Sequence, residues 1–213
     1  RIKQTLAECE RHGIDTLLAR ADNFVARLLR EYWNEGGRIQ WIAQTAPERR
    51  TVAESVRMAA RRGAHAIYLQ GEQANAMGRE DRWDELSSVI DLVREQGVPA
   101  GVASHDPTFH AERIGRGIDA DFALQCLYNR TGYQGKIHQQ GHEDFHHDDR
   151  RAALEAIARI DEPVLAYKVL GSGLGRVSPE KAIPELADYL RPKDAVMIGV
   201  YDEGRPDMIE QDV

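Results

Sequence analysis

Lys168 is the residue whose type and position point most directly to chemistry in this sequence. It lies near the end of an apolar segment of strand length, residues 163–169, and precedes a turn with glycines at 171, 173 and 175. A lysine amine can bind an anion, act as a base when it is buried, or form an imine with a carbonyl substrate. The backbone N–H groups of a glycine-rich turn can contact an anion or a polar ligand. We therefore predict a small-molecule substrate site beside Lys168.

Two further polar residues follow apolar segments of strand length. His105 is the last residue of the segment 100–105, and Asp22 lies shortly after the segment 15–20. In parallel barrels the catalytic groups come from the carboxyl ends of strands and from the loops after them. We expect Lys168, His105 and Asp22 to be catalytic, with Lys168 or His105 supplying a proton. The alternative is that each polar group only hydrogen-bonds its own loop.

A histidine-rich segment, residues 130–149, forms the longest connection in the chain. His138, His142 and His146 are spaced four apart, so one helical face would align them as metal ligands. Together with Glu72 and His105 they predict a mixed nitrogen and oxygen site for a divalent cation. The alternative is a solvated polar lid, since histidine-rich tracts are only compositional evidence of metal binding.

The elements that must position these residues alternate regularly. Apolar segments of strand length are separated by amphipathic helical patterns, except after the last one. The sequence predicts an α/β (β/α)8 barrel as one domain over residues 1–213. We expect the first strand and the last helix of the barrel to lie outside this sequence, so that the barrel is truncated at both ends. An open doubly wound sheet is the alternative, because periodicity does not distinguish a closed sheet from an open one. The seven predicted strands are 15–20, 39–44, 66–71, 100–105, 122–129, 163–169 and 195–200.

Local patterns make finer predictions. Thr51 and Glu54 form a capping box that starts a helix, and Ser178 before Pro179 caps another. Along residues 163–169 every second side chain is bulky and suits the face of the strand that packs against the helices. Lys168 belongs to the other set of residues, so it is expected to point into the barrel.

Composition limits the class of partner. The chain of 213 residues has 42% apolar and 30% charged residues and a formal charge of -7, which argues against a general nucleic-acid partner. No segment has the length and apolarity of a membrane span, and no signal peptide is visible. Cys9 and Cys126 are expected to be free thiols in a reducing cytoplasm. The oligomeric state is left open.

Four segments together resemble the aldo-keto reductases. Residues 125–129 are similar to that family's sixth strand, which places a glutamine at the nicotinamide carboxamide. Residues 166–175 resemble its seventh strand and glycine turn, where a tyrosine stacks on the nicotinamide ring. Residues 101–104 resemble its fifth strand, and residues 196–199 with 207–211 look like its last strand and the helix that grips the adenosine phosphate. The resemblance implies NADP(H) bound by Gln125, Tyr167, Gly171, Gly173 and Ser104.

The family's catalytic tetrad of Asp, Tyr, Lys and His is not matched. Asp22 can stand for the aspartate, but the places of the lysine and histidine hold Gln44 and Gln70, and no tyrosine follows Asp22. The first hypothesis is nevertheless an aldo-keto-reductase-like oxidoreductase acting on a small carbonyl or sugar-like substrate. The second is a divalent-metal-dependent isomerase, epimerase or lyase. The third is a barrel without catalysis that serves as a binding subunit.

Overall fold

Seven parallel strands alternate with helices in the computed structural model, which describes residues 1–127, 147–171, 177–200 and 207–212. The order of the strands in the sheet is their order in the chain. The strands are β1 Thr16–Arg20, β2 Gln40–Gln44, β3 Ala66–Leu69, β4 Ala100–Ser104, β5 Phe122–Cys126, β6 Val164–Tyr167 and β7 Ala195–Val196. The helices are α1 Ile2–Arg11, α2 Asn23–Asn34, α3 Val52–Arg61, α4 Gly71–Arg79, α5 Trp83–Arg94, α6 Phe109–Gly115, α7 His147–Ile157, α8 Pro179–Ala187 and α9 Met208–Asp212.

This alternation in chain order confirms the predicted class, an α/β (β/α)8 barrel. Several strands end earlier than predicted. The strand expected over 163–169 ends at Tyr167. The strand expected to reach residue 71 ends at Leu69, and an unpredicted helix, α4, begins at Gly71. The last strand, expected over 195–200, is limited to Ala195–Val196. After β7 the apolar residues continue beyond the last ladder pairing, and after β3 the chain turns into α4 within two residues. Periodicity does not show where a ladder ends.

By its internal contacts the chain divides into two compact units, which we describe separately. Unit 1 comprises residues 1–70, 88–101 and 200–213, and unit 2 comprises residues 71–87 and 102–199. Strand β4 starts in the first and ends in the second. The expectation of a single domain stays a prediction.

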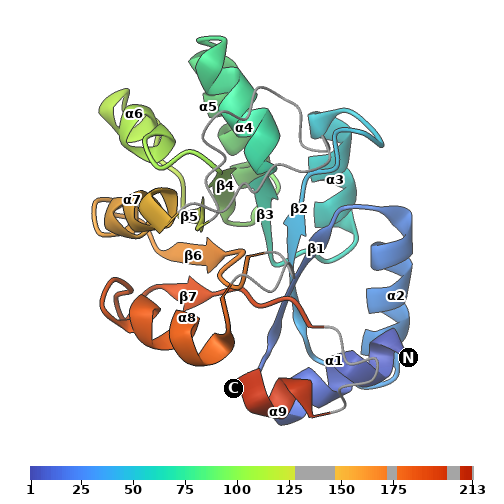
Figure 1. Cartoon of the computed structure of the whole chain (residues 1–213). Coiled ribbons are helices and arrows are strands. Elements are labelled where there is room, and N and C mark those ends of the chain that lie inside the picture. The colour runs from blue at the N-terminus through green and yellow to red at the C-terminus, as the bar shows by residue number, and fades with distance from the viewer. Residues whose placement is uncertain (128–146, 172–176, 201–206, 213) are drawn as a thin grey trace. The chain divides into compact units, whose positions relative to one another are not determined.

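Unit 1 is built on the neighbouring strands β1, β2 and β3 (Figure 1). Leu18 is in register with Ile42, and Ile42 with Ala66. All four residues of β3 are buried, as in a parallel strand that is covered on both faces. Trp41 of β2 is completely buried, and its indole N–H donates to the Ala19 carbonyl at 3.1 Å. These strands therefore form the core of unit 1.

Unit 2 has a separate apolar cluster around β5, β6 and β7, which also lie side by side in Figure 1. Ala123 is in register with Val164, and Ala166 with Val196. Leu154 and Ile157 of α7 pack into this cluster, and so does Leu186 of α8. This packing fixes the carboxyl end of β6, where the candidate site begins.

In the described part of the chain, no helix has both the length and the apolar character that a membrane span requires.

Candidate functional site

Lys168 and His105 are brought together in unit 2. Lys168 directly follows β6, and His105 directly follows β4. The Lys168 Nζ lies 3.3 Å from the His105 Nε2, and both residues are half-buried. An amine and an imidazole at hydrogen-bond distance can share and transfer a proton. The two sequence-predicted proton donors therefore form one pair.

The backbone of Lys168 has a left-handed conformation, with φ of 57°. Among the described residues only Asp81 is another non-glycine residue with positive φ. Such a conformation costs about 1–3 kcal/mol and persists only where the surroundings impose it. Here the Gly171 N–H donates to the Lys168 carbonyl at 2.9 Å and closes the turn, with Gly171 itself at φ of 70°.

This turn changes which side chains reach the site. Strict alternation would send Tyr167 and Lys168 to opposite faces, so the sequence forced a choice between them. In the structure both contact His105. The Tyr167 ring meets the imidazole edge to face, with centroids 5.8 Å apart. The Lys168 Nζ lies 5.9 Å from the centre of the Tyr167 ring, within range of a cation–π contact.

Asn75 of α4 positions His105 from the other side. Its side-chain oxygen accepts from the His105 backbone N–H at 2.9 Å, and its amide donates to the Ser104 Oγ at 2.8 Å. The Tyr167 hydroxyl donates to the Ser104 carbonyl at 3.1 Å. Asn75 is buried, so both of its hydrogen bonds are shielded from water.

Gly71, the first residue of α4, lies against the same residues. A Cβ placed at Gly71 would lie 3.0 Å from the His105 ring and 3.1 Å from the Tyr167 hydroxyl. A side chain at this position would therefore have to displace His105 or Tyr167 by a few tenths of an ångström. Sequence reasoning missed α4 and Asn75; the helix-forming run after Gly71 was the available signal.

The residues predicted to bind NADP(H) have structural partners. Ser104 is fully buried, and its hydroxyl also donates to the Asp106 carbonyl at 2.9 Å. Gln125 is fully buried as well. Its amide donates to the Cys126 carbonyl at 3.0 Å, and its oxygen has no partner in the described part of the chain. Their role in cofactor binding stays a prediction, as does that of Tyr167 and Gly171, while Gly173 lies outside the described residues.

Asp22 and Glu72 also have structural partners, and their predicted catalytic and metal-binding roles stay predictions. Asp22 belongs to unit 1, where its carboxylate caps α2 by accepting from the Val25 N–H at 2.9 Å. Glu72, in unit 2, pairs with Arg79 of the same helix at 2.8 Å. The described residues contain no group of three metal-ligating side chains. His138, His142 and His146 lie outside the described residues, so the metal site stays a prediction.

A buried arginine supports the turn after Lys168. Arg150 of α7 is 2% exposed, and its guanidinium donates to the Val169 carbonyl at 2.9 Å. It also pairs with Glu185 of α8 at 2.7 Å. The arginine thus holds the chain one residue beyond Lys168 and ties it to two helices.

Similar solved structures are barrel enzymes. An N-acetylmannosamine-6-phosphate 2-epimerase from Clostridium perfringens superposes with a TM-score of 0.59 at 14% identity, over 99% of this chain and 84% of that one. A D-psicose 3-epimerase from Clostridium cellulolyticum H10 gives a TM-score of 0.51 at 12% identity, over 92% and 78%. A putative deoxyribose-phosphate aldolase from Coccidioides immitis gives 0.51 at 14% identity, over 91% and 74%.

At these identities the likeness shows the fold alone. No protein-family model and no curated protein matches the chain. These structures support the predicted barrel fold. They do not support the resemblance to the aldo-keto reductases or the binding of NADP(H).

Proposed function

We propose that this chain is an isomerase, epimerase or lyase that transfers a proton at the carbon next to the carbonyl of a small sugar-like substrate. The observation that carries the proposal is the 3.3 Å contact between the Lys168 amine and the His105 imidazole at the ends of β6 and β4. Catalytic groups of parallel barrels come from this end of the strands.

The two groups have different roles in this proposal, because one is neutral and the other is positively charged. Neutral His105 accepts the proton from the substrate carbon, and the Lys168 ammonium stabilises the negative charge that develops on the carbonyl oxygen. Return of the proton to the opposite face of that carbon gives an epimer, and return to the neighbouring carbon gives an isomer. In a lyase the same negative charge arises when a carbon–carbon bond breaks. None of these reactions needs a nicotinamide.

The kinds of enzyme with a similar fold support this choice. Two are named as epimerases of sugars or sugar phosphates and one as a putative aldolase. The support is by analogy of fold, since one barrel fold carries many chemistries. The geometry of Lys168 and His105 is what connects that analogy to residues of this chain.

Proton exchange tests the proposal. The protein is incubated in D2O with a panel of aldoses, ketoses and their phosphates, and proton NMR follows loss of the signal beside the carbonyl. Lys168→Met and His105→Asn should each abolish exchange while circular dichroism stays native. Lys181→Met is the matched control, because Lys181 is an exposed lysine on α8. Exchange that persists in both site variants, or that appears with no member of the panel, would contradict the proposal.

A second measurement separates the imine route from simple acid–base chemistry. Borohydride added during turnover traps an imine as a stable adduct on the lysine. Mass spectrometry of an adduct at Lys168 would assign a lyase that works through an imine. Exchange without an adduct would assign an isomerase or epimerase.

A further inference from the structure

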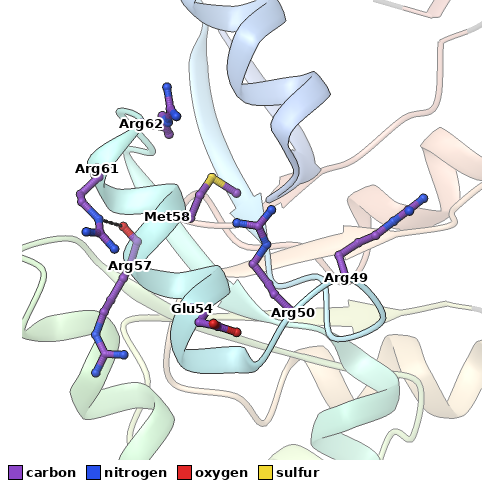
Figure 2. A pocket seen from close by; sticks show the side chains of 7 residues that line it. All are labelled: Arg49, Arg50, Glu54, Arg57, Met58, Arg61 and Arg62. Atoms are coloured by element: carbon purple, nitrogen blue, oxygen red, sulfur yellow. Dashed lines mark hydrogen bonds between the residues drawn. The ribbon is translucent and has the colours of Figure 1, made fainter.

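An open hollow of about 770 Å³ lies along α3 in unit 1 and is lined largely by arginines (Figure 2). We call it the arginine hollow. Arg49 and Arg50 lie on the segment before α3, and the other three lie along the helix and just after it. The seven lining residues are Arg49, Arg50, Glu54, Arg57, Met58, Arg61 and Arg62.

The five guanidinium groups of the hollow form no ion pair with a carboxylate of the described chain. Arg50 donates to the Asn23 side-chain oxygen at 3.3 Å, and its buried Nε has no partner within that part of the chain. Arg61 donates to the backbone carbonyl of Arg57 at 3.0 Å (Figure 2). The cationic charge of the hollow is therefore left uncompensated.

Several arginines elsewhere in the described chain have carboxylate partners. Examples are Arg82 with Glu80, Arg113 with Glu162, and Arg191 with Asp194, each pair at 2.8 Å. A cluster of unpaired arginines stands out in a chain whose formal charge is -7. Like charges that line the same hollow repel one another, and a bound anion would offset this repulsion.

Glu54 is the one carboxylate that lines the hollow, and it caps the start of α3. Glu54 accepts from the Thr51 backbone N–H at 3.0 Å and from its hydroxyl at 2.8 Å, completing a capping box. These hydrogen bonds lower the pKa of Glu54, and the charges of Arg50 and Arg57 lower it further. Because Glu54 lies within 4 Å of none of the five guanidiniums, it leaves them available for a ligand.

We propose that the arginine hollow binds a small soluble anion that carries two or more phosphate groups. Guanidinium groups match phosphate oxygens through paired N–H donors, and they keep their charge at every physiological pH. Arg57 and Arg61 are one helical turn apart, about 6 Å along the axis, so they can hold neighbouring phosphates. The volume of the hollow lies within the range of small-molecule sites. The acidic net charge disfavours a long nucleic acid as the occupant.

Isothermal titration with inorganic tripolyphosphate at about 0.15 M salt tests the proposal, since this salt screens weak surface attraction. We expect tripolyphosphate to bind at least about tenfold more tightly than orthophosphate, because several guanidiniums engage it together. The double variant Arg57→Gln, Arg61→Gln should weaken binding by at least about tenfold, because charge-assisted hydrogen bonds are the strong ones. The matched control is Arg11→Gln, Arg27→Gln, which removes two exposed arginines of unit 1 that pair with Glu8 and Glu31. The control should bind tripolyphosphate as the parent chain does.

Each other outcome overturns the proposal. Absence of heat with tripolyphosphate shows that the hollow is not an anion site. An equal loss in both double variants shows that binding follows net charge and not this hollow. Tighter binding of a single-stranded oligonucleotide than of tripolyphosphate assigns the surface to nucleic acid. Circular dichroism confirms that the variants are folded, which is expected because Arg57 and Arg61 are exposed.

Discussion

At the scale of single residues, the candidate site depends on a few buried hydrogen bonds around His105. Asn75 holds the backbone of His105 and the hydroxyl of Ser104 at the same time. Neither of these residues touches the Lys168 amine in the way that His105 does. They are positioning residues in the proposed function, and they act by fixing the imidazole.

Replacement of Asn75 by alanine should destabilise unit 2 and loosen His105. The change removes the acceptor of the His105 N–H and the donor to Ser104, which costs about 1–3 kcal/mol for buried groups. Urea unfolding measures this loss, and the deuterium exchange assay should slow in parallel. Asn34→Ala, at the exposed end of α2, is the control and should change stability by less than about 0.5 kcal/mol. Equal stability of the two variants would contradict the positioning role.

Replacement of Gly71 by alanine should displace His105, because the new Cβ would lie 3.0 Å from its ring. The expected result is a change in the NMR chemical shifts of the His105 imidazole, with the rest of the fold retained. Gly115→Ala is the control: it is also a helical glycine, and a Cβ there meets nothing within 4 Å. That control should be neutral or stabilising by up to about 1 kcal/mol. Unchanged His105 chemical shifts in Gly71→Ala would show that the close approach has no consequence.

At the scale of elements, two helix starts that looked equally well capped in the sequence differ in the structure. Thr51 forms the predicted capping box with Glu54 at the start of α3. Ser178 occupies the N-cap position of α8, with Pro179 in the first turn, but its side chain makes no capping hydrogen bond. Residue type therefore located both helix starts, and only the local backbone determined which hydroxyl reaches an N–H.

The two caps should respond differently to the same loss of a hydroxyl. Thr51→Ala should lower the free energy of unfolding by about 1 kcal/mol, because the Glu54 N–H loses its acceptor at 3.2 Å. Ser178→Ala should change it by only a few tenths of a kcal/mol. Chemical denaturation of both variants gives the comparison. A larger loss in Ser178→Ala than in Thr51→Ala would mean that the capping geometry is not the cause.

At the scale of the whole molecule, stability depends on buried titratable groups. Burial, followed by the charge of Arg113, lowers the pKa of His110 to about 3. Burial alone would raise the pKa of Glu162, but its hydrogen bond and ion pair with Arg113 outweigh that effect and lower it. Burial, followed by a hydrogen bond to Glu10, raises the pKa of Tyr32 to about 12. Each shift therefore makes the stability of the fold depend on pH, because the folded and unfolded chains bind protons at different pH values.

The chain should therefore lose stability toward acid in two stages. Below pH 6.5 the unfolded chain protonates His110 while the folded chain does not, so the free energy of unfolding falls as pH drops. Below about 4.5 protonation of Glu162 in the unfolded state adds to the loss. Urea midpoints measured from pH 8 to 4 check this, and His110→Gln should reduce the slope above pH 5 by up to about 1.4 kcal/mol per pH unit. An unchanged slope in that variant would rule out His110 as the acid-sensitive group.

The chain should also lose stability at alkaline pH, because of Tyr32. Above pH 10 the unfolded chain ionises Tyr32, so stability should fall as pH rises through about 12. Tyr32→Phe should reduce this alkaline loss, at the cost of the hydrogen bond to Glu10 at 2.7 Å. Absorbance of the phenolates during unfolding gives the measurement. A Tyr32→Phe chain that loses stability as steeply as the parent would contradict this assignment.

The sequence by itself determined the class of the fold and the polar residues at the ends of strands. Apolar segments of strand length and amphipathic helices are local patterns, so β1 to β6 and most helices could be predicted from periodicity. Lys168 and His105 could be selected because each follows such a segment.

Only the tertiary structure decided which of those residues meet. His105 and Lys168 are 63 residues apart, and their contact depends on where the ends of β4 and β6 lie in unit 2. The left-handed turn at Lys168 ends the alternation of the strand, so Lys168 and Tyr167 both reach His105 although periodicity assigns them to opposite faces. The capping role of Asp22 also became visible only in the structure, where its carboxylate accepts from the Val25 N–H at the start of α2, while its catalytic role stays a prediction. Periodicity records which side of an element a residue faces, and contacts between distant elements depend on packing that no local pattern contains.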